Sequence, residues 1–136
     1  MKPLLPVLLL ALAACDGAHP AAAGAHLDFL TERQDNARAE AMPRFEPGNG
    51  ALTVTGTMAT PCLGQQVGGA LRSTGDGIAL TVTVLPLPAC PTAIGYVGYT
   101  ARISNLPPGT YNVRVLYAPA PGETSLEAGR AQVRVR

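Results

Sequence analysis

The sequence has no tryptophan and only six other aromatic residues among its 136 positions. A core must therefore be built from valine, leucine, isoleucine and alanine, and apolar residues make up 47% of the chain. Charged residues make up only 14%, and the formal net charge is +1. A chain so nearly neutral lacks the clustered positive charge on which recognition of a nucleic-acid backbone depends. We therefore expect no nucleic-acid partner.

Histidine is also scarce, because the chain holds only His19 and His26. A Ser-His-Asp or Cys-His arrangement would have to use one of these two, and their spacing matches no recognised metal-ligand pattern. Glycines within residues 64–69 lack the Lys-Ser/Thr of a phosphate-binding loop. Beyond Gly50 the chain has only three acidic residues, Asp76, Glu123 and Glu127. These shortages predict that the protein is not an enzyme and has no cofactor and no metal.

The apolar run at the N-terminus, residues 4–14, is too short to cross a bilayer, which takes about 20 residues. It follows Lys2 and ends in small residues, which is the layout of a secretory signal peptide. A buried N-terminal strand or helix of a cytosolic protein is the alternative.

The residues Leu12-Ala13-Ala14-Cys15 resemble the lipobox of bacterial lipoproteins at every position. The resemblance implies cleavage before Cys15, a diacylglyceryl thioether on its sulfur and an acyl chain such as palmitate on the new amine. Cysteine suits this role because its thiolate is a nucleophile, and two or three acyl chains anchor a protein stably. Ordinary secretory cleavage after Ala11-Leu12-Ala13 is the competing interpretation, and it would leave Cys15 as a free thiol.

The resemblance to the lipobox implies a protein of the bacterial cell envelope, and we expect it to face the periplasm. Asp16 follows the lipid-accepting cysteine directly and resembles the inner-membrane retention signal of enterobacterial lipoproteins. That rule varies among bacterial groups, so the choice between inner and outer membrane stays open.

Residues 16–25 are small, polar residues typical of a linker. Residues 26–42 carry a weak helical pattern with little apolar content, which favours a tether or a short frayed helix. We predict a signal peptide over residues 1–14, a lipid anchor and tether over 15–50, and a folded domain over 51–136.

In the predicted domain the hydrophobic pattern changes to a period of two. Such alternation is typical of strands with one buried and one solvated face in antiparallel sheets. Glycine and proline number 15 and 13, which suits many short strands joined by turns. We predict an all-β, antiparallel two-sheet sandwich of six or seven strands. The strand segments are 51–57, 67–72, 78–84, 93–103, 110–117 and 130–136, with turns at 73–77 and 106–109.

Cys62 and Cys90 remain as an even pair in an oxidising compartment. Each lies in a loop beside proline, and a hairpin formed by segments 67–72 and 78–84 would bring the two loops to one end. We predict a disulfide closing a loop of about 29 residues, worth roughly 3.6 kcal/mol by loop entropy. Two free thiols or a metal-binding pair are the alternatives.

The segment Leu106-Pro107-Pro108-Gly109-Thr110-Tyr111, with the alternating residues after it, resembles a turn and strand of immunoglobulin-like and prealbumin-like sandwiches. These include carboxypeptidase regulatory domains, Cna-B-type domains and fibronectin type III domains. The resemblance covers about ten residues and implies that Tyr111 enters the core as its strand begins. It implies no catalytic residue, because these modules are binding or structural units.

We therefore expect a non-enzymatic, lipid-anchored envelope module that binds a protein partner or stabilises an assembly. Candidate contact surfaces are residues 62–66 and 86–92 together with Tyr96, whose alternative is packing against the second sheet or the tether. Arginines in the strands predict a basic stripe if they share one sheet face, and an ordinary solvated face otherwise: Arg102, Arg114 and Arg134.

Two further functions stay open. One is an envelope protease inhibitor that presents the disulfide-pinned loop at residues 85–91. The other is a binder of an apolar or carbohydrate ligand, which would need a large pocket between the sheets.

Overall fold

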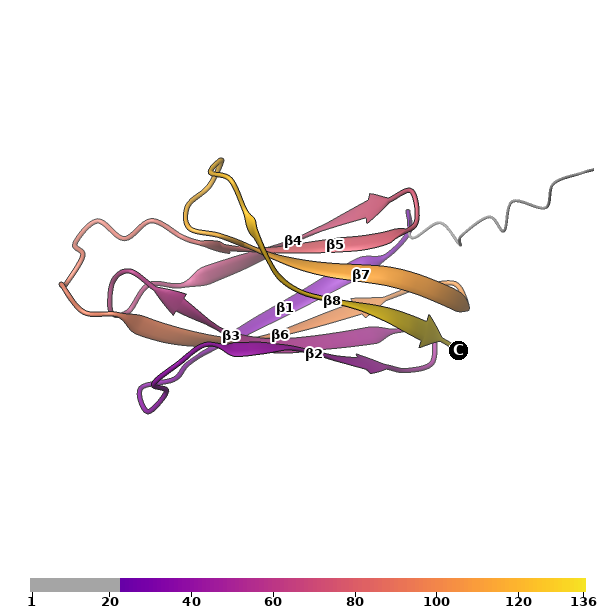
Figure 1. Cartoon of the computed structure of the whole chain (residues 1–136), viewed down its shortest axis with the longest axis horizontal. Coiled ribbons are helices and arrows are strands. Elements are labelled where there is room, and N and C mark those ends of the chain that lie inside the picture. The colour runs from indigo at the N-terminus through magenta and orange to yellow at the C-terminus, as the bar shows by residue number, and fades with distance from the viewer. Residues whose placement is uncertain (1–22) are drawn as a thin grey trace, which may run out of the picture.

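The computed structural model describes residues 23–136, so the signal peptide, Cys15, Asp16 and His19 lie outside the described residues. Eight strands form two four-stranded sheets that face each other (Figure 1). Sheet A has the order β1-β6-β3-β2, and sheet B has the order β4-β5-β7-β8. The strands are β1 (His26–Arg33), β2 (Ala41–Pro47), β3 (Leu52–Thr60), β4 (Val67–Thr74), β5 (Gly77–Val84), β6 (Gly95–Ser104), β7 (Gly109–Ala118) and β8 (Leu126–Val135). The predicted two-sheet sandwich is confirmed, with β3 to β8 at the six predicted segments. Within the described chain, no helix has the length and apolar character to cross a membrane.

The core lies between the sheets and is almost entirely aliphatic. Alternate residues of the central strands point inward, as a period of two requires, and many are completely buried. Its fully enclosed side chains include Leu52, Val54, Leu80, Val82, Ala101, Ile103, Val113 and Val115. Tyr111 enters the core at the start of β7, 1% exposed, as the resemblance implied.

One pair of strands departs from the expected antiparallel arrangement. The β5 and β7 strands are parallel, with Leu80 opposite Val115. Between them the chain crosses to sheet A as β6 and returns to sheet B, so β7 runs in the same direction as β5. All the other pairs are antiparallel.

The tether or short helix predicted for residues 26–42 is wrong, because these residues supply β1 and the start of β2. The sandwich therefore begins at β1 rather than at residue 51. At the edge of sheet A, β1 packs only Leu27 and Phe29 against the core. A register shift between Ala41 and Arg44 interrupts β2. Sparse burial and this irregularity explain why neither strand shows a clear period of two.

The connections gather at two ends of the sandwich (Figure 1). We call the end where β1 begins the proximal end, and it holds the turns at 48–51, 75–76 and 105–108 together with Arg136. The opposite, distal end holds the longer connections at 34–40, 61–66, 85–94 and 119–125.

Candidate functional site

The distal end is held by a disulfide between Cys62 and Cys90, whose Cα atoms are 5.2 Å apart. The β4–β5 hairpin brings their loops together, as predicted. Gln65 adds a polar brace: its carbonyl oxygen accepts a hydrogen bond from the Cys62 amide at 3.0 Å, and its amide nitrogen donates to the Leu85 carbonyl at 3.1 Å. The side chain is 8% exposed, so these bonds satisfy a largely buried amide.

An apolar cleft opens at the distal end, between the edge of sheet A at β2 and sheet B at β8. It has a volume of about 600 Å³. Met42 and Leu126, at the start of β2 and β8, are 77% and 73% exposed. The other apolar lining residues are Ala41, Pro43, Met58, Ala59, Pro61, Val84, Tyr117, Pro119 and Ala128. We call this site the distal cleft.

A tyrosine pair joins the two sheets beside the distal cleft. The hydroxyl oxygens of Tyr99 and Tyr117 lie 3.0 Å apart, with the Tyr99 ring stacked on Phe29 at 5.7 Å. Gly56 has no side chain to obstruct the Tyr99 ring, which occupies the position a Cβ there would take. Burial raises the pKa of both phenols, and the nearby Glu40 carboxylate raises each further. The lining of the cleft therefore includes the un-ionised phenol of Tyr117 and two carboxylates, Glu40 and Glu127, beside an apolar surface.

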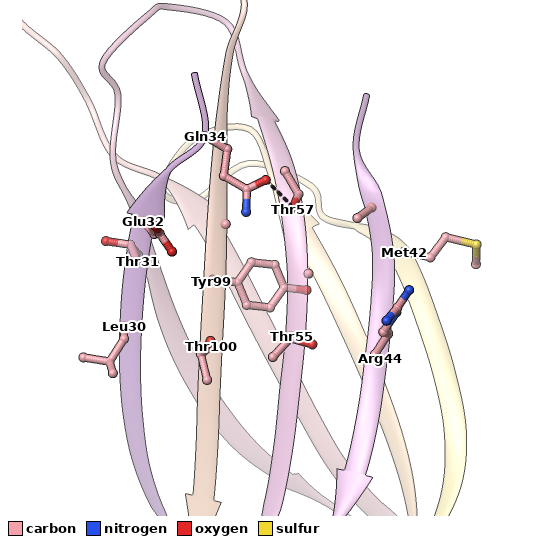
Figure 2. Close-up of a pocket in the computed structure, with 13 residues that line it drawn as sticks. Leu30, Thr31, Glu32, Gln34, Met42, Arg44, Thr55, Thr57, Tyr99 and Thr100 are labelled. Atoms are coloured by element: carbon pink, nitrogen blue, oxygen red, sulfur yellow. Dashed lines mark hydrogen bonds between the residues drawn. The ribbon is translucent and has the colours of Figure 1, made fainter. Parts of the chain in front are cut away.

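A second hollow, also of about 600 Å³, lies on the outer face of sheet A and is lined mainly by polar residues (Figure 2). Gln34 crosses this face and accepts a hydrogen bond from the Thr57 hydroxyl at 3.0 Å. Gly98 lies beneath the Gln34 amide and leaves the space that this side chain uses. Glu32 on β1 and Arg44 on β2 stand on opposite sides of the hollow (Figure 2). Sequence reasoning missed both hollows because β2 supplies part of each lining and β1 supplies part of the polar one.

Tyr96 lies against the β1–β2 connection, where its hydroxyl donates to the Arg38 carbonyl oxygen at 3.1 Å. The side chain is half-buried rather than freely projecting. The structure therefore favours the packing interpretation of Tyr96, against the segment predicted to be the tether.

The condition for a basic stripe of Arg102, Arg114 and Arg134 is not met, because Arg102 belongs to β6 of sheet A and the other two to sheet B. All three point away from the core, so the two groups lie on opposite outer faces. Arg114 pairs with Glu127 at 2.9 Å, and Arg130 pairs with the same carboxylate. The basic residues of sheet B form a different row, described below.

His26 is an exposed residue of β1 whose Nε2 lies 3.1 Å from an Asp28 carboxylate oxygen. Among residues 23–136, no group of three histidine, cysteine or acidic side chains could hold a metal ion. The Cys62–Cys90 disulfide also occupies the two thiols that a metal pair would need.

Comparison of the chain with protein-family models, with curated proteins and with solved structures finds no match.

Proposed function

We propose that this chain is a non-enzymatic, lipid-anchored module of the bacterial envelope whose distal end binds a protein partner. The observation that carries the proposal is the distribution of exposed large apolar side chains. Five of the six lie at the distal end, and only Leu30 does not. Clustered apolar exposure of this kind marks interaction surfaces. The five are Met42, Leu63, Leu85, Ile94 and Leu126.

The position of β1 supports this arrangement. The chain enters the sandwich at the proximal end, next to the β6–β7 turn (Figure 1). If Cys15 carries lipid, the residues between it and His26 span at most roughly 35 Å. The anchor would then lie on the proximal side, and the distal loops would face away from the membrane.

The chemistry of the distal cleft suits a protein partner. Methionine side chains adapt their shape to an incoming surface, and Met42 and Met58 both line the cleft. Prolines at positions 43, 61 and 119 stiffen the lining, which lowers the entropy lost on binding. An apolar side chain of the partner would displace water there at little conformational cost.

We also propose that the sandwich is related to immunoglobulin-like or prealbumin-like modules. The support for this kinship is the Tyr111 hydroxyl, which donates to the Pro107 carbonyl oxygen at 2.6 Å. A tyrosine closing the turn before its own strand resembles the tyrosine corner of immunoglobulin-like sandwiches. The kinship assigns a fold and no activity.

The test is capture of proteins from a membrane extract by the full chain. We expect a specific protein to bind the wild type and to be lost with Met42→Glu/Leu126→Glu, because charges would then line the mouth of the distal cleft. Leu30→Glu is the matched control, since Leu30 is 70% exposed but lies on the outer face of sheet A. Equal capture by both variants would contradict the distal site.

The anchor is tested separately. Radiolabelled palmitate should enter the wild-type protein and not Cys15→Ser, and globomycin should block processing. Labelling of both proteins would remove the lipobox assignment without affecting the distal cleft.

The distal cleft also favours a second function, binding of a small apolar ligand. Its volume of about 600 Å³ lies within the range of ligand pockets, roughly 300–1,000 Å³. A fluorescent fatty acid should then bind the wild type and be lost with the double variant. Binding to Leu30→Glu should be unchanged.

A further inference from the structure

Arginines form a row across the outer face of sheet B. Arg72 on β4 is paired with Ala79 on β5, which is paired with Arg114 on β7, which is paired with Arg130 on β8. The three arginines are exposed, whereas Ala79 is only 2% exposed. A small residue on an outer face becomes this buried when long neighbouring side chains cover it, so the arginine stems lie along the sheet. We call these three residues the arginine row.

The two outer faces differ in charge. The strands of sheet B carry four arginines and one acid, Glu127, while the strands of sheet A carry three arginines and three acids. In sheet A, Arg102 is paired across the strands with Asp28, whereas Arg72 has no acid in its row. The positive charge of the folded part is therefore concentrated on one face.

Glu127 gives the arginine row a fixed geometry. Its carboxylate accepts from the Arg114 Nε at 2.9 Å and from the Arg130 Nη2 at 2.8 Å. Hydrogen bonds from these two guanidinium groups hold the pKa of Glu127 at about 2, so the bridge persists at neutral pH. Each guanidinium keeps further N–H groups that are not used by Glu127, and Arg72 makes no ion pair within the described chain.

We infer that the outer face of sheet B binds an acidic polypeptide segment, whose carboxylates meet the arginine row. Strands about 4.8 Å apart place the three guanidinium stems over roughly 14 Å, a span matched by about four residues of extended chain. Oriented guanidinium groups suit bidentate contact with single carboxylates. Anionic lipid headgroups would be attracted by the positive charge alone. Their binding would gain nothing from the orientation that Glu127 gives to Arg114 and Arg130.

This inference rests on the proposed function only in taking the partner to be a protein. None of the three arginines lines the distal cleft, although Glu127, which joins two of them, does. The two surfaces predict different sensitivities. Contact at the arginine row should weaken with added salt, since exposed charges are screened, whereas apolar contact in the cleft should not.

The test uses the full chain in a neutral detergent and a fluorescent peptide of alternating glutamate and serine. We expect salt-sensitive binding, with the Kd raised about tenfold or more by Arg72→Gln/Arg130→Gln. The matched control is Arg44→Gln/Arg102→Gln, which removes the same charge from the outer face of sheet A. That control should change the Kd by less than about twofold. Thermal unfolding of both variants checks that each remains folded.

Four results would overturn the inference: no peptide binding, binding that ignores salt, an equal loss in both double variants, or equal binding of a glutamine–serine peptide. Vesicles containing phosphatidylglycerol test whether the same face binds an anionic membrane. If they bind through the arginine row and the peptide does not, the face contacts a membrane and not a protein. None of these outcomes changes the expected effect of Met42→Glu/Leu126→Glu, so the two proposals fail separately.

Discussion

The two ends of the sandwich are closed by different means. At the proximal end, short turns are fixed by the backbone: the Gly50 amide donates to the Arg136 carbonyl at 2.7 Å, and the Leu106 amide donates to the Gly50 carbonyl at 3.0 Å. Gly50 and Asn105 have φ values of 62° and 58°, which glycine and asparagine tolerate best. At the distal end, the longer loops also have backbone hydrogen bonds, such as the one that the Leu85 amide donates to the Gln66 carbonyl at 2.9 Å. They are held in addition by one disulfide and by the side chain of Gln65.

From this difference we infer that the proximal end serves stability and the distal end serves binding. Among the described residues, none of the exposed large apolar side chains lies at the proximal end. The distal end keeps its loops in place with a covalent bond, so apolar side chains there can remain exposed without the chain unfolding around them. Loops positioned by a rigid scaffold are where proteins commonly place their binding residues.

The largest expected effect comes from removing the distal covalent bond. Cys62→Ala/Cys90→Ala should lower the free energy of unfolding by about 3–4 kcal/mol, because the unfolded chain regains the entropy of a long loop. Urea denaturation measures this loss. Amide exchange should increase in residues 61–66 and 85–94 and stay slow at the proximal turns. Equally faster amide exchange at both ends would contradict the inference that the disulfide holds the distal loops in particular.

At the proximal end, the most sensitive position is a glycine. A Cβ at Gly77 would collide with the backbone of Asn112, its partner across the parallel pair. Gly77→Ala should therefore cost about 3 kcal/mol of stability, as overpacking does where backbone must move. Gly75→Ala is the control two residues away, because nothing lies within 4 Å of a Cβ there. Similar melting temperatures for the two variants would be inconsistent with this packing.

Removing one tyrosine hydroxyl at each end should change the stability by smaller amounts. Tyr111→Phe removes the proximal bond to the Pro107 carbonyl and should cost about 1 kcal/mol. Tyr96→Phe removes the distal bond to the Arg38 carbonyl and should cost less than about 0.5 kcal/mol, because this hydrogen bond is exposed to water although the Tyr96 side chain is half-buried. Both are measured by urea denaturation, and a larger loss for Tyr96→Phe would reverse the assignment.

The smallest effect concerns Glu127, near the distal start of β8. Its pKa is lowered to about 2 by the hydrogen bonds from Arg130 and Arg114. The stabilisation from its pairing should be complete above the unfolded pKa of about 4.3 and should be lost as the pH falls toward 2. NMR titration of the Glu127 carboxyl measures this, and Arg114→Gln should raise its pKa. An unchanged value in that variant would exclude the bridge.

The strands with strong patterns were predictable from the sequence, and those at the edge of sheet A were not. In β5, Ile78, Leu80 and Val82 are buried on one face, so their alternation is visible without any structure. In β1, only Leu27 and Phe29 pack against the core, and exposed charged residues surround them. A strand that buries so little has no pattern that distinguishes it from a polar linker.

The candidate site likewise has one part that was predictable from the sequence and one part that was not. The pairing of Cys62 with Cys90 was predictable because the intervening hairpin is encoded locally, in two alternating segments and the turn between them. The distal cleft was not, because Met42 and Leu126 lie far apart in the chain and meet only where the edges of the two sheets approach.

The two-sheet class, the positions of six strands and the prediction of a disulfide therefore follow from local patterns, because alternation and turn residues act over a few neighbouring positions. The sheet that each strand joins is known only from the folded arrangement. That arrangement separates Arg102 from Arg114 and aligns Arg114 with Arg72 and Arg130 in one row. The physical reason is that a strand's alternation specifies which side chains face the core, whereas its neighbours are set by how all the strands bury their apolar faces together.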